Sequence, residues 1–247
     1  MEGGKEVKGR PNNKRYTVTS QLKRTLFKDG IHFSIAMAGL SYSRLCTDLL
    51  VLSKNEYSRH KEGRKTLTQE DCTCQISALS HAWQVVDSVN RLRELLSLAP
   101  DIRKQDTEYK LFSRQTKNVK HLRDHIQHLN TQIMQFIGQR IPAWGILNWV
   151  SKLDDSDAVL SFSLVPGQLF ERKTPAISPV GIQVTTSIGI ITLVSDKEVC
   201  LSDLVEIQVM RIADWLQKTQ GIDFPSPPQS FFASMVFEPY KSPGAQL

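Results

Sequence analysis

The spacing of apolar residues changes once along this chain of 247 residues, and the change limits the folds that the chain can adopt. Between residues 20 and 141, apolar residues recur at intervals of three, four and seven, the period of an amphipathic α-helix. From residue 158 onward they alternate at every second position, the period of a half-buried strand. The sequence therefore predicts an α+β fold, in which an antiparallel bundle of long helices precedes a small antiparallel β-sheet with a covering helix.

The first part of the chain predicts three long helices. Ser20 is a suitable N-cap for a first helix that ends near Ser53, and the polar, charged residues 54 to 71 predict a loop. A second helix is expected from about residue 72 to residue 98, and a third from about residue 107 to residue 141. Three helices of this length predict an elongated antiparallel bundle.

The third helix has the most regular pattern of the three. Its length predicts a rod on the order of 50 Å. We expect its core face to bury Leu122, Ile126, Leu129 and Ile133.

Two polar residues interrupt the apolar stripe of the second helix. These are Asp87 and Asn90, and the stripe in which they lie is largely apolar. They predict either a buried polar network or side chains that face a binding site.

The second part of the chain predicts strands and one further helix. Strands are expected at residues 158 to 165, 180 to 184 and 188 to 194, and Asp203 is expected to cap a last helix that Gly221 ends. Residues 174 to 195 carry no charge and are long enough to cross a bilayer. Their prolines, glycines and β-branched residues favour strands instead, so we expect no membrane partner.

Four segments follow from these patterns. Residues 1 to 19 predict a flexible basic arm, residues 20 to 150 a helical bundle domain, and residues 151 to 221 a small α+β domain. Residues 222 to 247 form a proline-rich tail that contains the apolar sequence FFASMVF at 231 to 237. We expect this apolar sequence to bind either the protein's own surface or a partner protein.

The positive charge is concentrated near the N-terminus. Residues 1 to 28 contain eight basic and two acidic residues, which equals the whole net charge of +6. Such an arm can attract phosphates or acidic surfaces, or it can be a solvated tail that aids solubility. The run holds few aromatic residues that would stack on bases, which favours the solvated tail.

The cysteines indicate neither a disulfide framework nor a zinc site. Cys72 and Cys74 lack the two-residue gap of common zinc knuckles, and Cys46 and Cys200 stand alone. Residues 1 to 15 are polar and do not resemble a signal peptide. A cytoplasmic location is therefore expected.

The one stretch with a specific chemical interpretation is HLRDHIQHLN at residues 121 to 130. On a helical wheel, His121, His125 and His128 form one band beside the stripe of Leu122, with His125 nearest the core. Imidazoles on one face can bind zinc, copper or nickel. Three ligands on consecutive turns of one straight helix rarely surround one ion, so we expect no metal and no cofactor. Packing of the band against a neighbouring helix or a dimer partner is the structural alternative.

The segment RDHIQH within this stretch resembles the R-x4-H signature of the HEPN superfamily (higher eukaryotes and prokaryotes nucleotide-binding domains). The arginine corresponds to Arg123, the adjacent polar residue to Asp124 and the histidine to His128. The resemblance covers at most residues 20 to 141. It implies a dimeric helical bundle that cleaves RNA without a metal, in a cleft where the arginine and histidine of both protomers meet.

The chemistry that the resemblance implies is general acid–base catalysis. The histidine would move the proton of a ribose 2′-hydroxyl group, and the arginine would stabilise phosphate charge in the transition state. Five helical steps place Arg123 and His128 about 140° apart on a straight helix. A local bulge or a second protomer would have to bring them to one phosphate.

Two functions therefore remain open. One is a HEPN-like protein that binds RNA or acts as an endoribonuclease in a bacterial toxin or defence system, with RNA and a second copy at the third helix as its partners. The other is a non-enzymatic interaction or scaffolding protein with a protein partner for its tail. No glycine-rich phosphate loop, H-E-x-x-H or G-x-S-x-G motif indicates another enzyme class.

Overall fold

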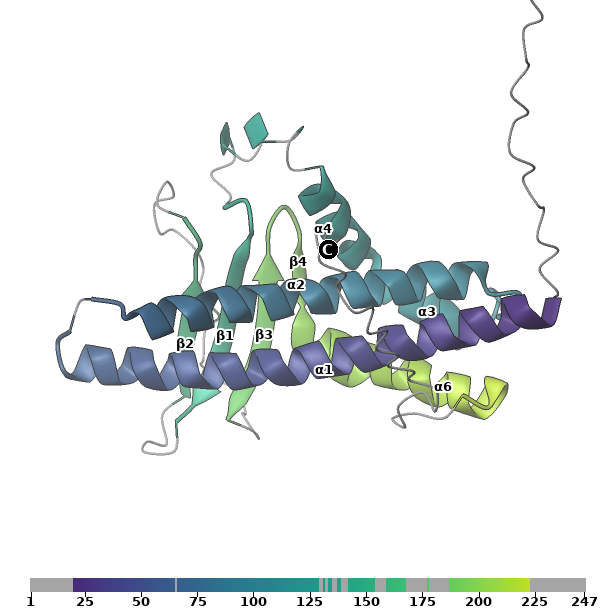
Figure 1. The fold of residues 1–247 in the computed structure, drawn as a ribbon, viewed down its shortest axis with the longest axis horizontal. Coiled ribbons are helices and arrows are strands. Elements are labelled where there is room, and N and C mark those ends of the chain that lie inside the picture. The colour runs from purple at the N-terminus through teal and green to yellow at the C-terminus, as the bar shows by residue number, and fades with distance from the viewer. Residues whose placement is uncertain are drawn as a thin grey trace, which may run out of the picture.

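Two long antiparallel helices, α1 (Ser20–Lys61) and α2 (Gln69–Leu98), form the longest part of the fold and lie across a four-stranded sheet (Figure 1). The computed structural model describes residues 20–64, 66–128, 131, 133–134, 137–138, 142–153, 159–167, 177 and 187–222. The predicted α+β class, with long helices before a small antiparallel sheet and a C-terminal helix, is confirmed.

The first helix is longer than predicted. It continues past Ser53 to Lys61, so most of the loop expected at residues 54 to 71 is wrong. An ion pair between Glu56 and Arg59 and the basic residues of the last turn stabilise this polar extension, because cations are favoured at a helix C-terminus. The extension was missed because its stability comes from charges and not from apolar periodicity.

A capping box fixes the start of α2. The Thr68 hydroxyl accepts a hydrogen bond from the Asp71 amide at 3.1 Å, and the Asp71 carboxylate accepts one from the Thr68 amide at 3.0 Å. Asn55 of α1 also donates to Asp71 at 2.9 Å. The chain therefore reverses within a few residues, and α2 packs back along α1.

The predicted third helix is two helices. α3 (Thr107–Gln115) and α4 (Lys117–Gln127) meet at Thr116, which is fully buried. The Thr116 hydroxyl donates to the Phe112 carbonyl at 2.6 Å, while Arg93 of α2 donates to the Ser113 carbonyl at 2.7 Å and to the Thr116 hydroxyl. These side chains take carbonyl groups that a continuous helix would use. The single rod was therefore a wrong prediction.

The core face expected of this helix is only partly buried. Leu122 is fully buried and Ile126 is partly buried, but Ile133 is half exposed. Leu129 lies outside the described residues. The predicted burial of Ile133 is wrong, because the break at Thr116 redirects α4 away from the long helices, as Figure 1 shows.

The sheet has the order β2-β1-β3-β4, and all its neighbouring strands are antiparallel. The strands are β1 (Ile146–Lys152), β2 (Val159–Leu164), β3 (Ile188–Val194) and β4 (Glu198–Cys200). The strands predicted at 158 to 165 and 188 to 194 are confirmed by β2 and β3, whereas residues 180 to 184 lie outside the described residues.

β1 was not expected, and the predicted domain boundary near residue 150 falls inside it. Its five central residues are all buried, so both faces are covered and no two-residue alternation marks it in the sequence. Gly145, with φ of 71°, turns the chain into β1, where a Cβ atom would lie 2.7 Å from the Val194 carbonyl oxygen. Trp149 of β1 donates to the Ser53 hydroxyl of α1 at 2.8 Å and joins the sheet to the helices.

The C-terminal helix begins before Asp203, so the predicted cap at that residue is wrong. The helix starts at Leu201, widens into a π-helical segment, η1 (Asp203–Val209), and continues as α6 (Met210–Gln220). The Ser202 hydroxyl accepts from the Ile191 amide at 2.9 Å and ties this start to β3. Gly221, with φ of 61°, ends the helix as predicted.

One contiguous set of buried side chains joins the helices and the sheet. It includes Leu45 of α1, Leu92 of α2, Leu122 of α4, and Leu147 and Leu193 of the sheet. The helices and the strands are thus stabilised by a shared core.

Candidate functional site

The histidine stretch lies on α4 and at its C-terminal end. His125 is buried, whereas His121 and His128 are exposed. This agrees with the helical wheel, which places His125 nearest the core. In the part of the chain that the structure describes, no group of three or more His, Cys, Asp or Glu residues could hold a metal ion.

Arg123 is directed toward α2. Its Nε atom lies 3.3 Å from Asp87 Oδ1, and its Nη1 atom lies 3.4 Å from Glu94 Oε1. Arg91 of α2 donates to the other oxygen of Asp87 at 2.8 Å. Arg123 therefore connects α4 to α2 through two carboxylates.

His128 lies away from this network of charges. Its backbone N–H donates to the Asp124 carbonyl at 3.1 Å and closes the last turn of α4. Within the described ranges, no hydrogen bond or ion pair joins the side chain of Arg123 or Asp124 to that of His128. The structure places all three predicted site residues on one helix end but does not join them into one constellation.

The polar residues inside the stripe of α2 belong to a polar network, the first of the two interpretations that the sequence left open, and Asp87 also lines a groove. Asn90 is buried and donates to Glu94 at 2.8 Å, so it belongs to a polar network. Asp87 pairs with Arg91 and Arg123 and also faces a groove.

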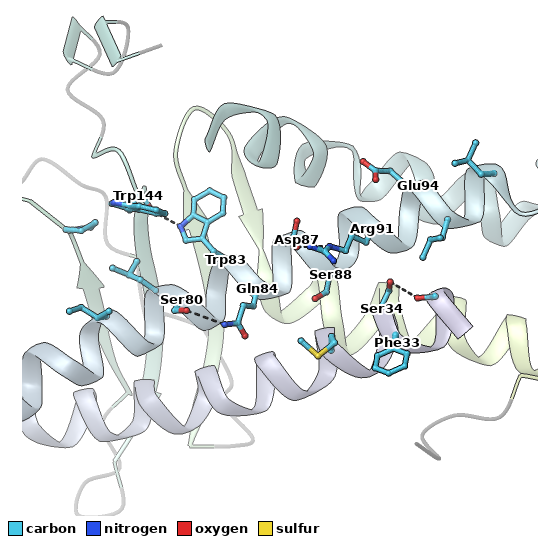
Figure 2. A pocket seen from close by; sticks show the side chains of 17 residues that line it. Phe33, Ser34, Ser80, Trp83, Gln84, Asp87, Ser88, Arg91, Glu94 and Trp144 are labelled. Carbon is cyan, nitrogen blue, oxygen red and sulfur yellow. Dashed lines mark hydrogen bonds and ion pairs between the residues drawn. The ribbon is translucent and has the colours of Figure 1, made fainter. Parts of the chain in front are cut away.

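This groove lies on the described surface and has a volume of about 1110 Å³. It runs along α1 and α2, and Figure 2 shows its side chains. Ten of its lining residues have no polar side chain apart from the indole groups: Gly30, Phe33, Met37, Ile76, Leu79, Trp83, Leu95, Leu98, Trp144 and Pro166. We call this set and the space that it lines the α1–α2 groove.

Several of these side chains are large, apolar and more than half exposed. Ile76 is 70% exposed, Leu98 is 68% exposed and Trp144 is 51% exposed. Burial of apolar surface is favourable by about 25 cal/mol per Å², so covering these residues would stabilise the protein. Exposed apolar patches of this kind are typical of interaction surfaces.

The geometry of the α1–α2 groove suits a segment of polypeptide. Its α2 wall extends from Ile76 to Leu98, a length of about 33 Å at 1.5 Å per residue. At one end, Trp83 donates to the Trp144 carbonyl at 3.1 Å, which fixes the indole ring (Figure 2). The charged residues Asp87, Arg91 and Glu94 lie along the wall between the ends.

Sequence reasoning missed this groove. The helical period predicts α2 but does not show which of its faces a neighbouring element covers. The available signal was an excess of apolar positions: α1 and α2 carry apolar residues around more of their circumference than packing against each other and the sheet requires.

α1 is also long and apolar enough, by length and composition, to cross a membrane. The core helix of a soluble protein meets the same criterion, and α1 contributes fully buried residues such as Ala38, Leu45 and Leu49 to the core.

Comparison with protein-family models, with curated proteins and with solved structures finds no match to the chain. The resemblance to the HEPN superfamily, carried by Arg123, Asp124 and His128, stays a prediction.

Proposed function

We propose that this chain is a non-enzymatic interaction protein that binds an apolar helical segment of a partner protein in the α1–α2 groove. The observation that supports it is the exposure of large apolar side chains along one groove of about 33 Å. An amphipathic helix placed in such a groove buries residues at positions i, i+3, i+4 and i+7. Two antiparallel helices offer a suitable channel for it.

The charges of the groove indicate what kind of segment binds. The carboxylates of Asp87 and Glu94 are balanced by Arg91 and Arg123, so the wall has no excess of either sign. Affinity is therefore expected to come from apolar contact, with the charges favouring one orientation of the partner. Binding should change little with salt, unlike binding to nucleic acid.

RNA cleavage has weaker support. Arg123 already has two carboxylate partners, which compete with a phosphate for its guanidinium group. No contact between its side chain and that of His128 is found among the described residues.

The test is co-purification of tagged full-length chain from its source cells, quantified by mass spectrometry. Ile76→Asp places a charge in the groove at an exposed position, so the fold should survive. Met210→Asp is the matched control, because Met210 is 53% exposed on α6 and does not line the groove. We expect at least one protein to be recovered equally with wild type and Met210→Asp and to fall at least tenfold with Ile76→Asp. Identical recovery with all three chains would contradict the proposal.

A further inference from the structure

The end of α6 lies at the same end of the helical pair as the Gly30 and Leu98 end of the α1–α2 groove. The Gln220 carbonyl accepts a hydrogen bond from Lys28 of α1 at 3.1 Å, and the Gln220 side chain donates to the Asp101 carbonyl at 3.3 Å. Lys28 is two residues from Gly30, and Asp101 is three residues from Leu98, and both Gly30 and Leu98 line the groove. Ile222 is buried just after this point. The chain therefore leaves the described structure at the end of the helical pair where Gly30 and Leu98 line the groove, on the side of α1 that packs on α6.

The segment that follows has the composition of a groove ligand. Residues 231 to 237, FFASMVF, contain three phenylalanines, one methionine and one valine and carry no charge. Residues 223 to 230 precede them and include Pro225, Pro227 and Pro228. Such a linker favours extended backbone and reaches at most about 26 Å, at roughly 3.3 Å per residue. This reach covers most of a groove about 33 Å long.

We infer that residues 231 to 237 occupy the α1–α2 groove of their own chain when no partner is bound. This inference rests on the proposed function, since it assigns an occupant to the same groove. The groove is apolar and charge-balanced, which matches a segment that is apolar and uncharged. Burial of the three phenylalanine rings supplies the contact area.

Tethering favours this segment over a second copy of the chain. A ligand on a short linker that can span the distance to its site has an effective concentration of up to about the millimolar range. A second copy would have to be present at a comparable concentration to compete. The tail also lowers the apparent affinity of the groove for a partner, because the partner must displace the tail before it can bind. An occupancy of about 90% weakens partner binding about tenfold.

The test is photo-crosslinking of the full-length chain. Photoreactive p-benzoylphenylalanine replaces Met37 in one chain and Leu98 in a second, since both side chains line the groove. A third chain carries it at Val51 as a matched control, because Val51 and Met37 are each 42% exposed on α1 but only Met37 lines the groove. Mass spectrometry then maps the crosslinked peptides in an equal mixture of ¹⁵N-labelled and unlabelled chains.

We expect crosslinks from positions 37 and 98 to residues 231 to 237 within one isotopic chain, and at least tenfold fewer from position 51. Crosslinks that join labelled to unlabelled chains would overturn the inference and assign a second copy to the groove. Crosslinks to the tail that are equally frequent from all three positions, or absent from both groove positions, would also overturn it. The proposed function is tested by a different experiment: it is contradicted if Ile76→Asp leaves the co-purification of partner proteins unchanged.

Discussion

At the scale of single residues, Arg93 determines where the third helix breaks. Its guanidinium group donates to the Ser113 carbonyl and the Thr116 hydroxyl, and burial lowers its pKa. Arg93→Met should lower the free energy of unfolding by about 1.5–3 kcal/mol, since hydrogen bonds from a charged group are lost. Urea denaturation measures this. Arg91→Met on the same helix is the control, because its ion pair with Asp87 is exposed and worth about 0–1 kcal/mol. Equal losses in both variants would contradict this account.

Arg123 and His128 separate the interaction protein from the nuclease. In our account, Arg123→Ala removes contacts to Asp87 and Glu94 and lowers the free energy of unfolding by about 1 kcal/mol, whereas His128→Ala changes it by less than about 0.5 kcal/mol. Neither variant should alter the effect of the protein on mixed RNA with chelator present. Thermal melts and an RNA degradation assay measure the two effects. Cleavage by wild type that both substitutions abolish would restore the nuclease interpretation.

The thiol of Cys200 makes the free energy of unfolding depend on pH in the alkaline range. Burial is the main cause that raises the pKa of its thiol from 9.0 to about 11. The folded state thus holds the proton more tightly than the unfolded state, so this contribution is complete below pH 9.0 and is lost as the pH rises to about 11. Melting temperatures at pH 8 to 11 should therefore fall more steeply for wild type than for Cys200→Ala. Parallel curves for the two chains would contradict the shift.

At the scale of elements, the capping box of α2 decides where the helical hairpin turns. The pKa of Asp71 is lowered chiefly because its carboxylate accepts from the Thr68 backbone. Thr68→Ala should lower the free energy of unfolding by about 1 kcal/mol, the usual cost of losing an N-cap side chain. Chemical denaturation measures the loss, and Thr66→Ala, two residues earlier in the exposed loop, is the control. Equal free energies of unfolding for Thr68→Ala and Thr66→Ala would contradict the stabilising role of the capping box.

The helices and strands also show which parts of the fold the spacing of apolar residues can predict. Helical and strand periods were enough to predict α2, β2 and β3, because the apolar residues of α2 follow a helical period and those of β2 and β3 include a two-residue period. They could not predict the break at Thr116, which depends on Arg93, 23 residues earlier in the chain. They also missed β1, because a strand that is buried on both faces has no alternation.

The same limit applies to the candidate site. The sequence placed His125 nearest the core, and it is buried. It could not show that Arg123 turns toward Asp87 and Glu94, because those residues lie on another helix. The α1–α2 groove likewise depends on which apolar faces remain uncovered after packing, and no local pattern records this.

At the scale of the whole molecule, the two sides of the α1–α2 pair have different environments. One side of the pair packs on the sheet, where Trp149 bonds to Ser53, and on the C-terminal helix, where Tyr42 donates to Glu206 at 2.6 Å. The other side forms the wall of the α1–α2 groove and exposes Ile76 and Leu98. The helical pair thus contributes to the core on one side and lines the α1–α2 groove on the other; Figure 1 shows the pair lying across the sheet.

The central claim is that the α1–α2 groove binds apolar ligands, and titration with the fluorescent dye 8-anilinonaphthalene-1-sulfonate tests it most directly. The full-length chain would carry Phe231→Ser and Phe232→Ser, so that its own tail does not compete with the dye. Adding Ile76→Asp should reduce the fluorescence increase several-fold, whereas adding Met210→Asp should leave it unchanged, because only Ile76 lines the groove. An increase that is the same with Ile76→Asp as with Met210→Asp would contradict the claim.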